Sequence, residues 1–380
     1  MIKILFVIPG LSAGGAEKVL RNLVNNLDQS KFDITVQTID KEDADKYLTS
    51  GIHYKAINRC KSKIGKKIFN LWFRFCAEFG LAYPLFIKDD YDIEIAYLEC
   101  GATKIIASST NKKALKLAWV HCDLTKKEGF SGSASKTKKY YNSYDKVVCV
   151  SQDVRKSFQS LYGKDIQSEV LHNVIDEDEI FAKAEEKIDV NTNESEKVLV
   201  AVGRLAWEKN FVHLIETCYK LNKEGYKFKL FILGEGPERE NLEKLISERH
   251  LENIVELVGF KDNPYPYMKA ADFIVCSSRY EGISTVVTEG LILGKPIITT
   301  PCSGMRELFG DYQCGIIAED SSDGLYECFR KIFDSSELEK HYAEEAEKRG
   351  EFFSKKKVIE ETSKFFITEL SEKNLQNLAE

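Results

Sequence analysis

Residues 3–27 read KILFVIPGLSAGGAEKVLRNLVNNL and contain one complete strand–turn–helix unit. Residues 3–11 form an almost continuous apolar run, which ends in a glycine-rich turn at residues 12–16. From residue 17 to residue 27, large apolar residues recur every three or four positions, which is the spacing of one helix face. A strand that is apolar on both faces and is followed by a helix is typical of a parallel sheet covered by helices.

The same alternation continues along the whole chain, with one interruption. The polar segment AEEKIDVNTNESEK at residues 184–197 interrupts it, and we interpret this segment as a linker. Apolar runs lie on both sides of it, at residues 33–39, 54–58, 92–98, 115–121, 146–151, 170–175, 198–205, 228–234, 254–259, 273–277, 296–300 and 315–318. We therefore expect an α/β protein with two doubly wound, Rossmann-like domains that face each other across a cleft.

The expected domains are an N-terminal domain at residues 1–183 and a C-terminal domain at residues 198–350, followed by a helical segment at residues 351–380 that can cross back to the first domain. A chain of 380 residues exceeds what one hydrophobic core usually supports, which agrees with two domains. The apolar share of 43% and the charged share of 30% exclude wholesale disorder and a polytopic membrane protein.

Apolar runs and cysteine spacing indicate where the protein is located and whether it binds a metal or a cofactor. No run of eighteen apolar residues is present, and the apolar N-terminus is too short for a signal peptide, so we expect a cytoplasmic protein. The ten cysteines are scattered without metal-site spacing, and short Asp-x-Asp strings such as Asp43/Asp45 fit loops. We therefore predict no bound metal and no cofactor.

The charge is divided unevenly. Residues 1–172 carry 27 Lys and Arg against 19 Asp and Glu, whereas the remainder carries 27 against 41. The acidic half disfavours wrapping of a nucleic acid, and the basic half is suited to anionic lipid. Residues 59–88 contain seven basic residues, seven aromatic residues and the single acid Glu78. Together with Lys136, Lys138 and Lys139, this segment can bind a membrane surface. The alternative is a buried helix whose aromatic residues pack in the core.

Ligands of open parallel sheets bind beyond the carboxyl ends of the strands, so the loops there are the candidate sites. Gly14 and Gly15 can bring backbone N–H groups close to an anion, although a tight turn explains them equally well. Arg204 and Lys209 follow a later strand and can converge on one phosphate. Two surface cations, or an Arg204–Glu208 pair, are the alternative.

Glu281 and Glu289 provide the sharpest pattern. Two carboxylates eight positions apart can bind hydroxyls at two points of one elongated ligand, and the amides of Ile283–Thr285 between them can hold an anion. Ser284 can cap the helix that carries Glu289. A phosphate flanked by hydroxyl groups describes a sugar nucleotide. An acidic loop and a partly buried helical Glu remain the alternative. His121 ends a strand, where it can bind a hydroxyl or transfer a proton, or serve the fold alone.

These residues together resemble a known family, the family 4 retaining glycosyltransferases of the GT-B fold. The resemblance is carried by Gly14-Gly15-Ala16-Glu17, by Gly203-Arg204-Leu205 with Lys209-Asn210, by Glu281 and Glu289, and by the surrounding run 278–300. Residues 98–99, 119–121 and 284–289 look most like enzymes that assemble capsular or other surface polysaccharides of bacteria. Two positions depart from the family: Ile283 stands where Phe is frequent, and Asn173-Val174 where Asn-Gly is frequent.

The resemblance implies a role for each residue. Arg204 and Lys209 would bind the pyrophosphate of the donor, Glu289 the ribose, and Glu281 the transferred sugar. Gly15 and His121 would act beside Glu281 at the reaction centre. The remaining donor-binding residues would be Gly14, Gly282, Ile283, Ser284 and Thr285. Preorganised cations and helix N-termini can stabilise the departing phosphate without a metal ion.

The expected function is transfer of a hexose-type sugar, with retention, from a nucleotide sugar that we expect to be a UDP-sugar. The acceptor would be a glycan or a lipid-linked molecule in surface polysaccharide or glycolipid assembly, met at the inner face of the cell membrane. A nucleotide-sugar epimerase and an inactive homologue that acts as a scaffold are the alternatives.

Overall fold

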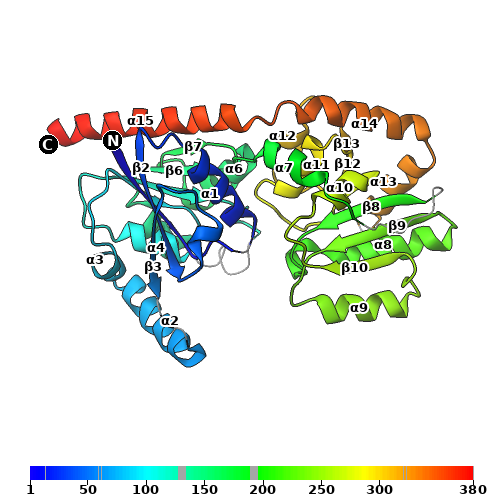
Figure 1. Cartoon of the computed structure of the whole chain (residues 1–380), viewed down its shortest axis with the longest axis horizontal. Helices are drawn as coiled ribbons and strands as arrows, with labels where there is room; N and C mark the ends of the chain where they lie inside the picture. Colours follow the sequence, from blue (N-terminus) through cyan, green and yellow to red (C-terminus); the bar gives the residue numbers. More distant parts are fainter. Residues whose placement is uncertain are drawn as a thin grey trace. The chain divides into compact units, whose positions relative to one another are not determined.

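The computed structural model describes residues 1–12, 14–58, 60, 62–126, 134–188, 196–319, 321 and 323–379. The chain divides into two compact units (Figure 1). Unit 1 comprises Met1–Val174 and Lys355–Glu380, and unit 2 comprises Ile175–Ser354.

Unit 1 is built on a parallel sheet of seven strands in the order β3-β2-β1-β4-β5-β6-β7. The strands are β1 (Ile2–Ile8), β2 (Phe32–Asp40), β3 (His53–Asn58), β4 (Ile93–Ala96), β5 (Leu115–Val120), β6 (Lys146–Cys149) and β7 (Ser168–Val170). The strand order reverses between β1 and β4, so the loops that follow these two strands diverge there and leave room for a ligand.

Helices cover the sheet of unit 1. They are α1 (Gly15–Asn26), η1 (Ala44–Lys46), α2 (Lys63–Glu78), α3 (Ala82–Phe86), α4 (Gly101–Ala107), α5 (Ala134–Tyr141), α6 (Gln152–Tyr162) and α15 (Lys355–Ala379). In α1, the apolar stripe predicted from the sequence is buried: Val19, Leu20, Leu23 and Val24 are at most 2% exposed. Burial of this stripe attaches the helix to the sheet.

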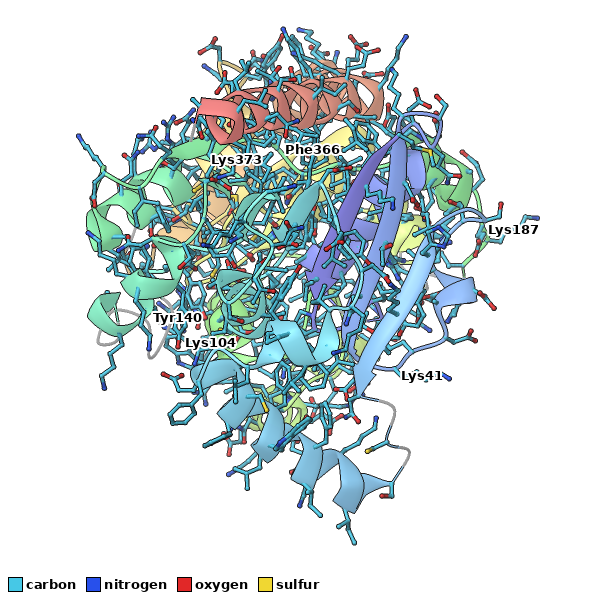
Figure 2. The ribbon with its side chains drawn as sticks, turned by 90° about the vertical axis from the view of Figure 1, so that its left-hand side faces the viewer. Lys41, Lys104, Tyr140, Lys187, Phe366 and Lys373 are labelled. Atoms are coloured by element: carbon cyan, nitrogen blue, oxygen red, sulfur yellow. The ribbon has the colours of Figure 1, made fainter. Side chains whose placement is uncertain are left out.

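The C-terminal helix α15 packs on unit 1 through Phe366. This ring is fully buried and meets Phe6, Phe32 and Trp119 at centroid distances of 6.1 to 6.3 Å (Figure 2). Farther along the helix, Glu369 pairs with Lys146, and Lys373 Nζ lies 2.9 Å from Asp145 Oδ1. One aromatic anchor and two ion pairs therefore attach the last helix to the first unit.

Unit 2 repeats the architecture with six parallel strands in the order β10-β9-β8-β11-β12-β13. The strands are β8 (Lys197–Val202), β9 (Phe228–Leu233), β10 (Val255–Gly259), β11 (Phe273–Cys276), β12 (Ile297–Thr299) and β13 (Gly315–Ile317). The order reverses between β8 and β11. The predicted α/β class, with two doubly wound sheets, is confirmed.

The helices of unit 2 are α7 (Glu177–Ala184), η3 (Trp207–Lys209), α8 (Phe211–Lys223), α9 (Arg239–Glu248), α10 (Tyr265–Ala270), α11 (Thr285–Ile292), α12 (Met305–Phe309), α13 (Gly324–Phe333) and α14 (Ser336–Gly350). Its core joins strand residues such as Leu199 and Phe273 to helix residues such as Leu214 and Phe329, all fully buried. Within the described ranges, no helix is both long and apolar enough to cross a membrane.

The boundary between the units differs from the expected domain limits at residues 183, 197 and 350. The chain passes from unit 1 to unit 2 at Val174, before α7. Helix α7 packs on α10 and α11, Asn263 Nδ2 donates to Lys183 O at 2.9 Å, and Lys269 pairs with Glu185 at 2.6 Å. The segment 184–197, which we interpret as a linker, therefore belongs to unit 2; its residues 189–195 lie outside the described residues.

A buried carboxyl in β4 makes the stability of unit 1 depend on pH. Glu94 is fully buried, and Tyr83 Oη donates to its Oε1 at 2.5 Å, whereas its Oε2 has no hydrogen-bond partner among the described residues. Burial raises the pKa of Glu94 above its ordinary value of 4.5. Folding therefore favours the protonated form, and the stability present below pH 4.5 is lost as the pH rises through the raised pKa.

We predict that Glu94→Gln reduces this pH dependence, because the amide cannot ionise. Because ionisation of the buried carboxyl destabilises the native chain, the variant should become more stable relative to the native chain as the pH rises from 5 to 8. Urea unfolding at both pH values measures the difference. Glu169→Gln, at an exposed position in β7, is the control. Equal pH dependence in the native chain and Glu94→Gln would contradict the prediction.

Candidate functional site

An ion pair joins the two loops at the point in unit 2 where the strand order reverses. Lys209 follows β8, Glu281 follows β11, and Lys209 Nζ lies 2.6 Å from Glu281 Oε1. Ser278 Oγ donates to the same carboxylate oxygen at 2.7 Å, and Ser277 Oγ donates to Lys209 O at 2.8 Å. The structure thus brings together two of the predicted site residues.

The Lys209–Glu281 pair is largely shielded from solvent. The two side chains are 23% and 15% exposed, respectively. Burial opposes the charge on Lys209, but the attraction of the Glu281 carboxylate outweighs it, so the pKa of Lys209 is raised well above its ordinary value. Lys209 therefore carries a permanent positive charge at physiological pH, in surroundings where that charge is weakly screened.

The loop after β9 packs against the loop after β8. Gly234 follows β9 with φ of +146°, and a Cβ atom there would overlap the carbonyl oxygen of Gly203. Leu205 N donates to Glu235 O at 3.0 Å, and Glu238 N donates to Leu205 O at 2.9 Å. Glycine at residue 234 is thus required by close backbone packing against Gly203 and Arg204.

Arg204 is exposed, and its guanidinium makes no hydrogen bond or ion pair within the described parts of the chain. The alternative Arg204–Glu208 pair is therefore not formed in the structure. Arg204 lies five residues before Lys209, so the segment after β8 holds one cation that is paired with a carboxylate and a second cation that is exposed to solvent.

Helix α11 begins directly after the Glu281 loop. Ser284 is its N-cap, accepting a hydrogen bond from Val287 N at 3.4 Å, and Gly282 packs against Gly304, whose φ is +80°. Ile283, Ser284 and Thr285 therefore surround a helix N-terminus, as predicted. Glu289, one turn farther on, is 3% exposed and accepts a hydrogen bond from Tyr265 Oη at 3.3 Å.

In unit 1, Gly14 and Gly15 are exposed at the start of α1, where Gly14 adopts φ of +108°. Few side chains tolerate this conformation, which explains the first glycine. Burial, reinforced by the negative charges of Glu42 and Glu99, raises the pKa of Glu17 in the first turn of α1. The loop after β1 is therefore surrounded by carboxylates.

Glu42 holds the loop that leads to the two glycines. Its Oε2 accepts from Leu11 N at 2.6 Å and its Oε1 from Ser12 Oγ at 2.8 Å. Glu42 N in turn donates to Tyr54 Oη at 2.8 Å, so β3 fixes the position of the clamp. Sequence reasoning missed Glu42 because thirty residues separate it from the loop, and no spacing pattern connects them.

His121 lies at the end of β5, beside Glu99 at the end of β4. His121 N donates to Glu99 Oε1 at 2.5 Å, and the His121 ring lies 5.0 Å from that of Tyr97. Glu99 is 3% exposed. The sequence pointed to Glu99 only as part of a resemblance, although this carboxylate positions the main chain of His121. Asp123 instead accepts hydrogen bonds from Thr125 and Ser157, a local structural role.

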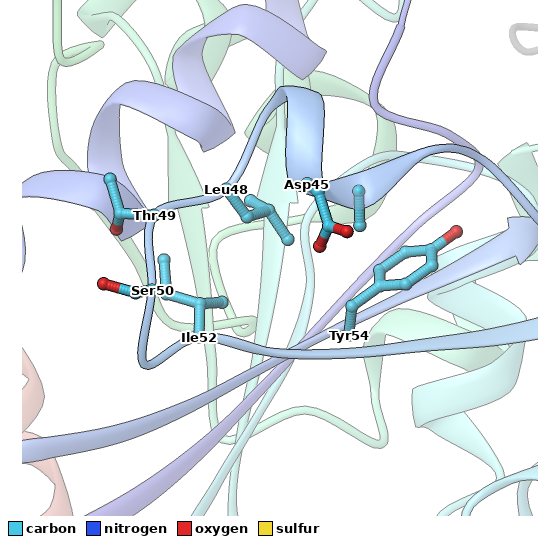
Figure 3. A pocket seen from close by; sticks show the side chains of 7 residues that line it. Asp45, Leu48, Thr49, Ser50, Ile52 and Tyr54 are labelled. Atoms are coloured by element: carbon cyan, nitrogen blue, oxygen red, sulfur yellow. The ribbon is translucent and has the colours of Figure 1, made fainter.

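A separate pocket of about 310 Å³ lies between η1 and β3 (Figure 3). It is lined by Ala44, Asp45, Leu48, Thr49, Ser50, Ile52 and Tyr54, and by none of the predicted site residues. In the ranges that the structure describes, no three His, Cys, Asp or Glu side chains are grouped so as to hold a metal ion.

Residues 182–349 match the model of the family "Glycosyl transferases group 1". The chain is 35% identical over 201 residues to an N-acetylgalactosamine-N,N'-diacetylbacillosaminyl-diphospho-undecaprenol 4-alpha-N-acetylgalactosaminyltransferase of Campylobacter jejuni, an alignment that covers 52% of this chain and about half, 53%, of that protein. It is 26% identical over 358 residues to the amylovoran biosynthesis glycosyltransferase AmsD of Erwinia amylovora, covering 91% of this chain and 94% of AmsD.

Solved structures agree with the fold. HepE of Anabaena, crystallised with UDP and glucose, superimposes with a TM-score of 0.75 over 96% of this chain and 99% of HepE, at 17% identity. Sucrose-phosphate synthase of Thermosynechococcus elongatus gives a TM-score of 0.74 over 98% of this chain and all of that chain, at 15% identity. The fold is therefore that of the GT-B glycosyltransferases.

We predict that Lys209 and Glu281 are energetically coupled. Removal of one partner leaves a poorly solvated charge, so Lys209→Met and Glu281→Gln should each destabilise the protein by roughly 1–3 kcal/mol, and the double variant by less than their sum. Urea unfolding of the four proteins measures the coupling. The control is the Lys197–Glu339 pair of the same unit, which has the same 2.6 Å separation but side chains 38% and 20% exposed. A coupling free energy no larger than that of the Lys197–Glu339 pair would show that shielding does not strengthen the Lys209–Glu281 pair.

We also predict that Glu42→Ala loosens the loop after β1. The Leu11 amide loses its acceptor, so its hydrogen exchange should accelerate by roughly tenfold or more, while amides in the centre of β1 keep their protection. Exchange followed by mass spectrometry with residue-level resolution measures this. Tyr54→Phe, which keeps the carboxylate but removes its support, should have a smaller effect. Unchanged exchange at Leu11 in Glu42→Ala would show that Glu42 does not hold the loop.

Proposed function

We propose that the protein is a retaining glycosyltransferase that moves a hexose-type sugar from a UDP-sugar to a glycan or lipid-linked acceptor in surface polysaccharide or glycolipid assembly. The observation that carries the proposal is the shielded Lys209–Glu281 pair, in the part of the chain that matches the glycosyltransferase family. Unit 2 would bind the donor and unit 1 the acceptor.

The cations of unit 2 suit the leaving group. Cleavage of the sugar–phosphate bond leaves negative charge on the departing phosphate. Lys209 keeps its charge, and Arg204 offers an exposed guanidinium fork that can bind two phosphate oxygens. The N–H groups at Ile283, Ser284 and Thr285 would add a helix N-terminus. These groups can supply the required charge stabilisation without a metal ion or a cofactor.

The carboxylates suit the sugar and the ribose. Oε1 of Glu281 is occupied by Lys209 and Ser278, which leaves Oε2 to accept hydrogen bonds from hydroxyls of the transferred sugar. Glu289 would bind the ribose hydroxyls, with Tyr265 fixing its carboxylate. Gly282 would allow the loop to approach the donor. From unit 1, the Gly14 and Gly15 backbone and the His121 ring would contact the sugar.

The proposed reaction breaks the bond between the anomeric carbon and the phosphate oxygen. The acceptor oxygen forms the new bond on the same face of the sugar, and its proton passes to the departing phosphate. This retaining outcome is proposed from the resemblance to family 4. The choice of a UDP-sugar is supported by HepE, which was crystallised with UDP and glucose.

The choice of acceptor is supported by the relatives. One is named for a diphospho-undecaprenol substrate, and another for the biosynthesis of amylovoran. We propose a cytoplasmic protein that works at the inner face of the cell membrane, without a nucleic-acid partner. The family match does not favour the epimerase alternative, and the intact charged set, Arg204, Lys209, Glu281 and Glu289, argues against an inactive scaffold.

A thermal-shift screen of UDP-, GDP- and ADP-sugars tests the donor. A ligand at 100 times its Kd adds about 2.7 kcal/mol of stability, so a UDP-sugar should raise the melting temperature by several degrees. Arg204→Ala and Glu289→Ala should each raise the UDP-sugar concentration needed for the same shift in melting temperature by at least tenfold. Lys244→Ala, which removes an exposed cation from α9, should leave that concentration unchanged.

Product analysis then distinguishes the enzyme classes. Sugar transferred only when an acceptor is present supports the transferase, and a changed sugar nucleotide without acceptor indicates an epimerase. If Arg204→Ala and Glu289→Ala left the cellular polysaccharide unchanged, a scaffold role would replace the proposal.

A further inference from the structure

Helix α2 presents an uncovered apolar stripe. It consists of Ile64, Ile68, Leu71, Trp72 and Phe75, continued by Phe79 just after the helix, and we call these six residues the apolar stripe. Their exposed fractions run from 46% for Trp72 to 75% for Leu71. Positions i, i+4, i+7, i+8, i+11 and i+15 lie on one helix face, so the stripe is continuous along the helix.

The opposite face of α2 already provides the contacts to unit 1. Phe73, Cys76 and Ala77 are at most 7% exposed and pack inward. The helix is therefore apolar on two faces, and the core of unit 1 uses only one of them. Figure 1 shows α2 at the margin of unit 1, pointing away from the sheet. The buried-helix alternative accounts for Phe73, and the Trp72 ring packs edge-on against Phe86 of α3 at a centroid distance of 5.5 Å. This alternative does not account for Leu71, Phe75 and Phe79, which are 55–75% exposed.

Positive charges lie along the stripe. Lys67 and Arg74 are exposed on one flank and form no ion pair within the described residues. Glu78, the single acid of the segment, is neutralised by Lys104 at 2.6 Å and Lys139 at 3.4 Å. The hydrogen bond from Lys104 and its charge lower the pKa of Glu78 to about 2, so this arrangement persists at physiological pH.

Lys104 and Lys139 also approach the ring of Tyr140, at 5.4 and 4.8 Å from its centroid (Figure 2). Two lysines against one carboxylate leave an excess of positive charge beside the end of α2. Of the basic residues expected in segment 59–88, Arg59 and Lys61 lie outside the described residues.

We propose that α2 lies along the surface of an anionic membrane and inserts the apolar stripe among the upper acyl chains. The flanking Lys67 and Arg74 would extend to lipid phosphates, as long basic side chains do at membrane interfaces. Insertion by the apolar stripe is the main source of affinity, and the cations select anionic lipid. The inference deepens the proposed function, because it places unit 1 where a lipid-linked acceptor would be found.

The charges favour a membrane over a second copy of the chain. In a twofold dimer the same surface meets itself, so Lys67 and Arg74 of both copies would be brought close together. An anionic lipid surface instead compensates them. The excess of 27 basic over 19 acidic residues in positions 1–172 adds attraction of the same sign.

Vesicle co-sedimentation tests the proposal on the full chain without nucleotide. The native protein should bind vesicles containing phosphatidylglycerol, and Leu71→Ser/Phe75→Ser should bind at least tenfold more weakly. Both side chains are exposed, so the fold should tolerate the change. The matched control is Leu375→Ser/Leu378→Ser, which removes two apolar side chains, 68% and 84% exposed, from α15 of the same unit. The control should bind as the native chain does.

A second double variant tests the lipid selectivity. Lys67→Glu/Arg74→Glu should lose the preference for phosphatidylglycerol over phosphatidylcholine vesicles. Equal vesicle binding by the native chain and by Leu71→Ser/Phe75→Ser would overturn the proposal. So would a native dimer, detected by light scattering, that the stripe variant converts to a monomer without a change in vesicle binding.

The thermal shift by a UDP-sugar separates this inference from the proposed function. Leu71→Ser/Phe75→Ser should keep the full shift in melting temperature. The apolar stripe belongs to unit 1, whereas Arg204 and Glu289, which the thermal-shift assay tests, belong to unit 2. If vesicle binding depended on the stripe but no nucleotide sugar shifted the native protein, the membrane surface would stand and the donor proposal would fail.

Discussion

The shielded ion pair between Lys209 and Glu281 is the interaction on which the loops at the strand-order reversal of unit 2 depend. It forms because β8 and β11 are neighbours at the point where the strand order reverses, so the loops that follow them meet although seventy-two residues separate them. Glu281 keeps Lys209 charged despite its burial, and Lys209 keeps Glu281 oriented. In the proposed function, this one contact would supply both a cation for a phosphate and a carboxylate for a hydroxyl.

In unit 1, carboxylates hold the segments that follow the strands by accepting backbone hydrogen bonds. Glu42 fixes the loop after β1, and Glu99 fixes the main chain at His121. The loop after β1 in unit 1 is thus rich in carboxylates, whereas the segment after β8 in unit 2 carries the cations Arg204 and Lys209. In the proposed reaction, positive charge develops on the sugar while negative charge develops on the phosphate, and a carboxylate-rich loop and a cation-bearing loop suit these two parts of the donor.

The long helices α15 and α2 of unit 1 both carry apolar side chains, but these side chains have different surroundings. Phe366 of α15 is enclosed by three aromatic rings, so its apolar side is consumed by the fold. Helix α2 also has a second apolar side, which unit 1 leaves largely exposed. An apolar surface that the fold leaves open indicates a partner, and the adjoining cations indicate that this partner is anionic.

The sequence by itself determined the α/β class, the two sheets and the loops that hold Lys209 and Glu281, because apolar runs of strand length and glycine turns are local patterns. It also indicated that Ser284 caps the helix of Glu289. Only the tertiary structure decided which charges meet, as in the pairing of Lys209 with Glu281 and the clamp from Glu42. The tertiary structure also shows that α7 belongs to unit 2 and which aromatic residues of α2 face outward. These outcomes depend on contacts between residues far apart in the chain, which spacing along the sequence does not encode.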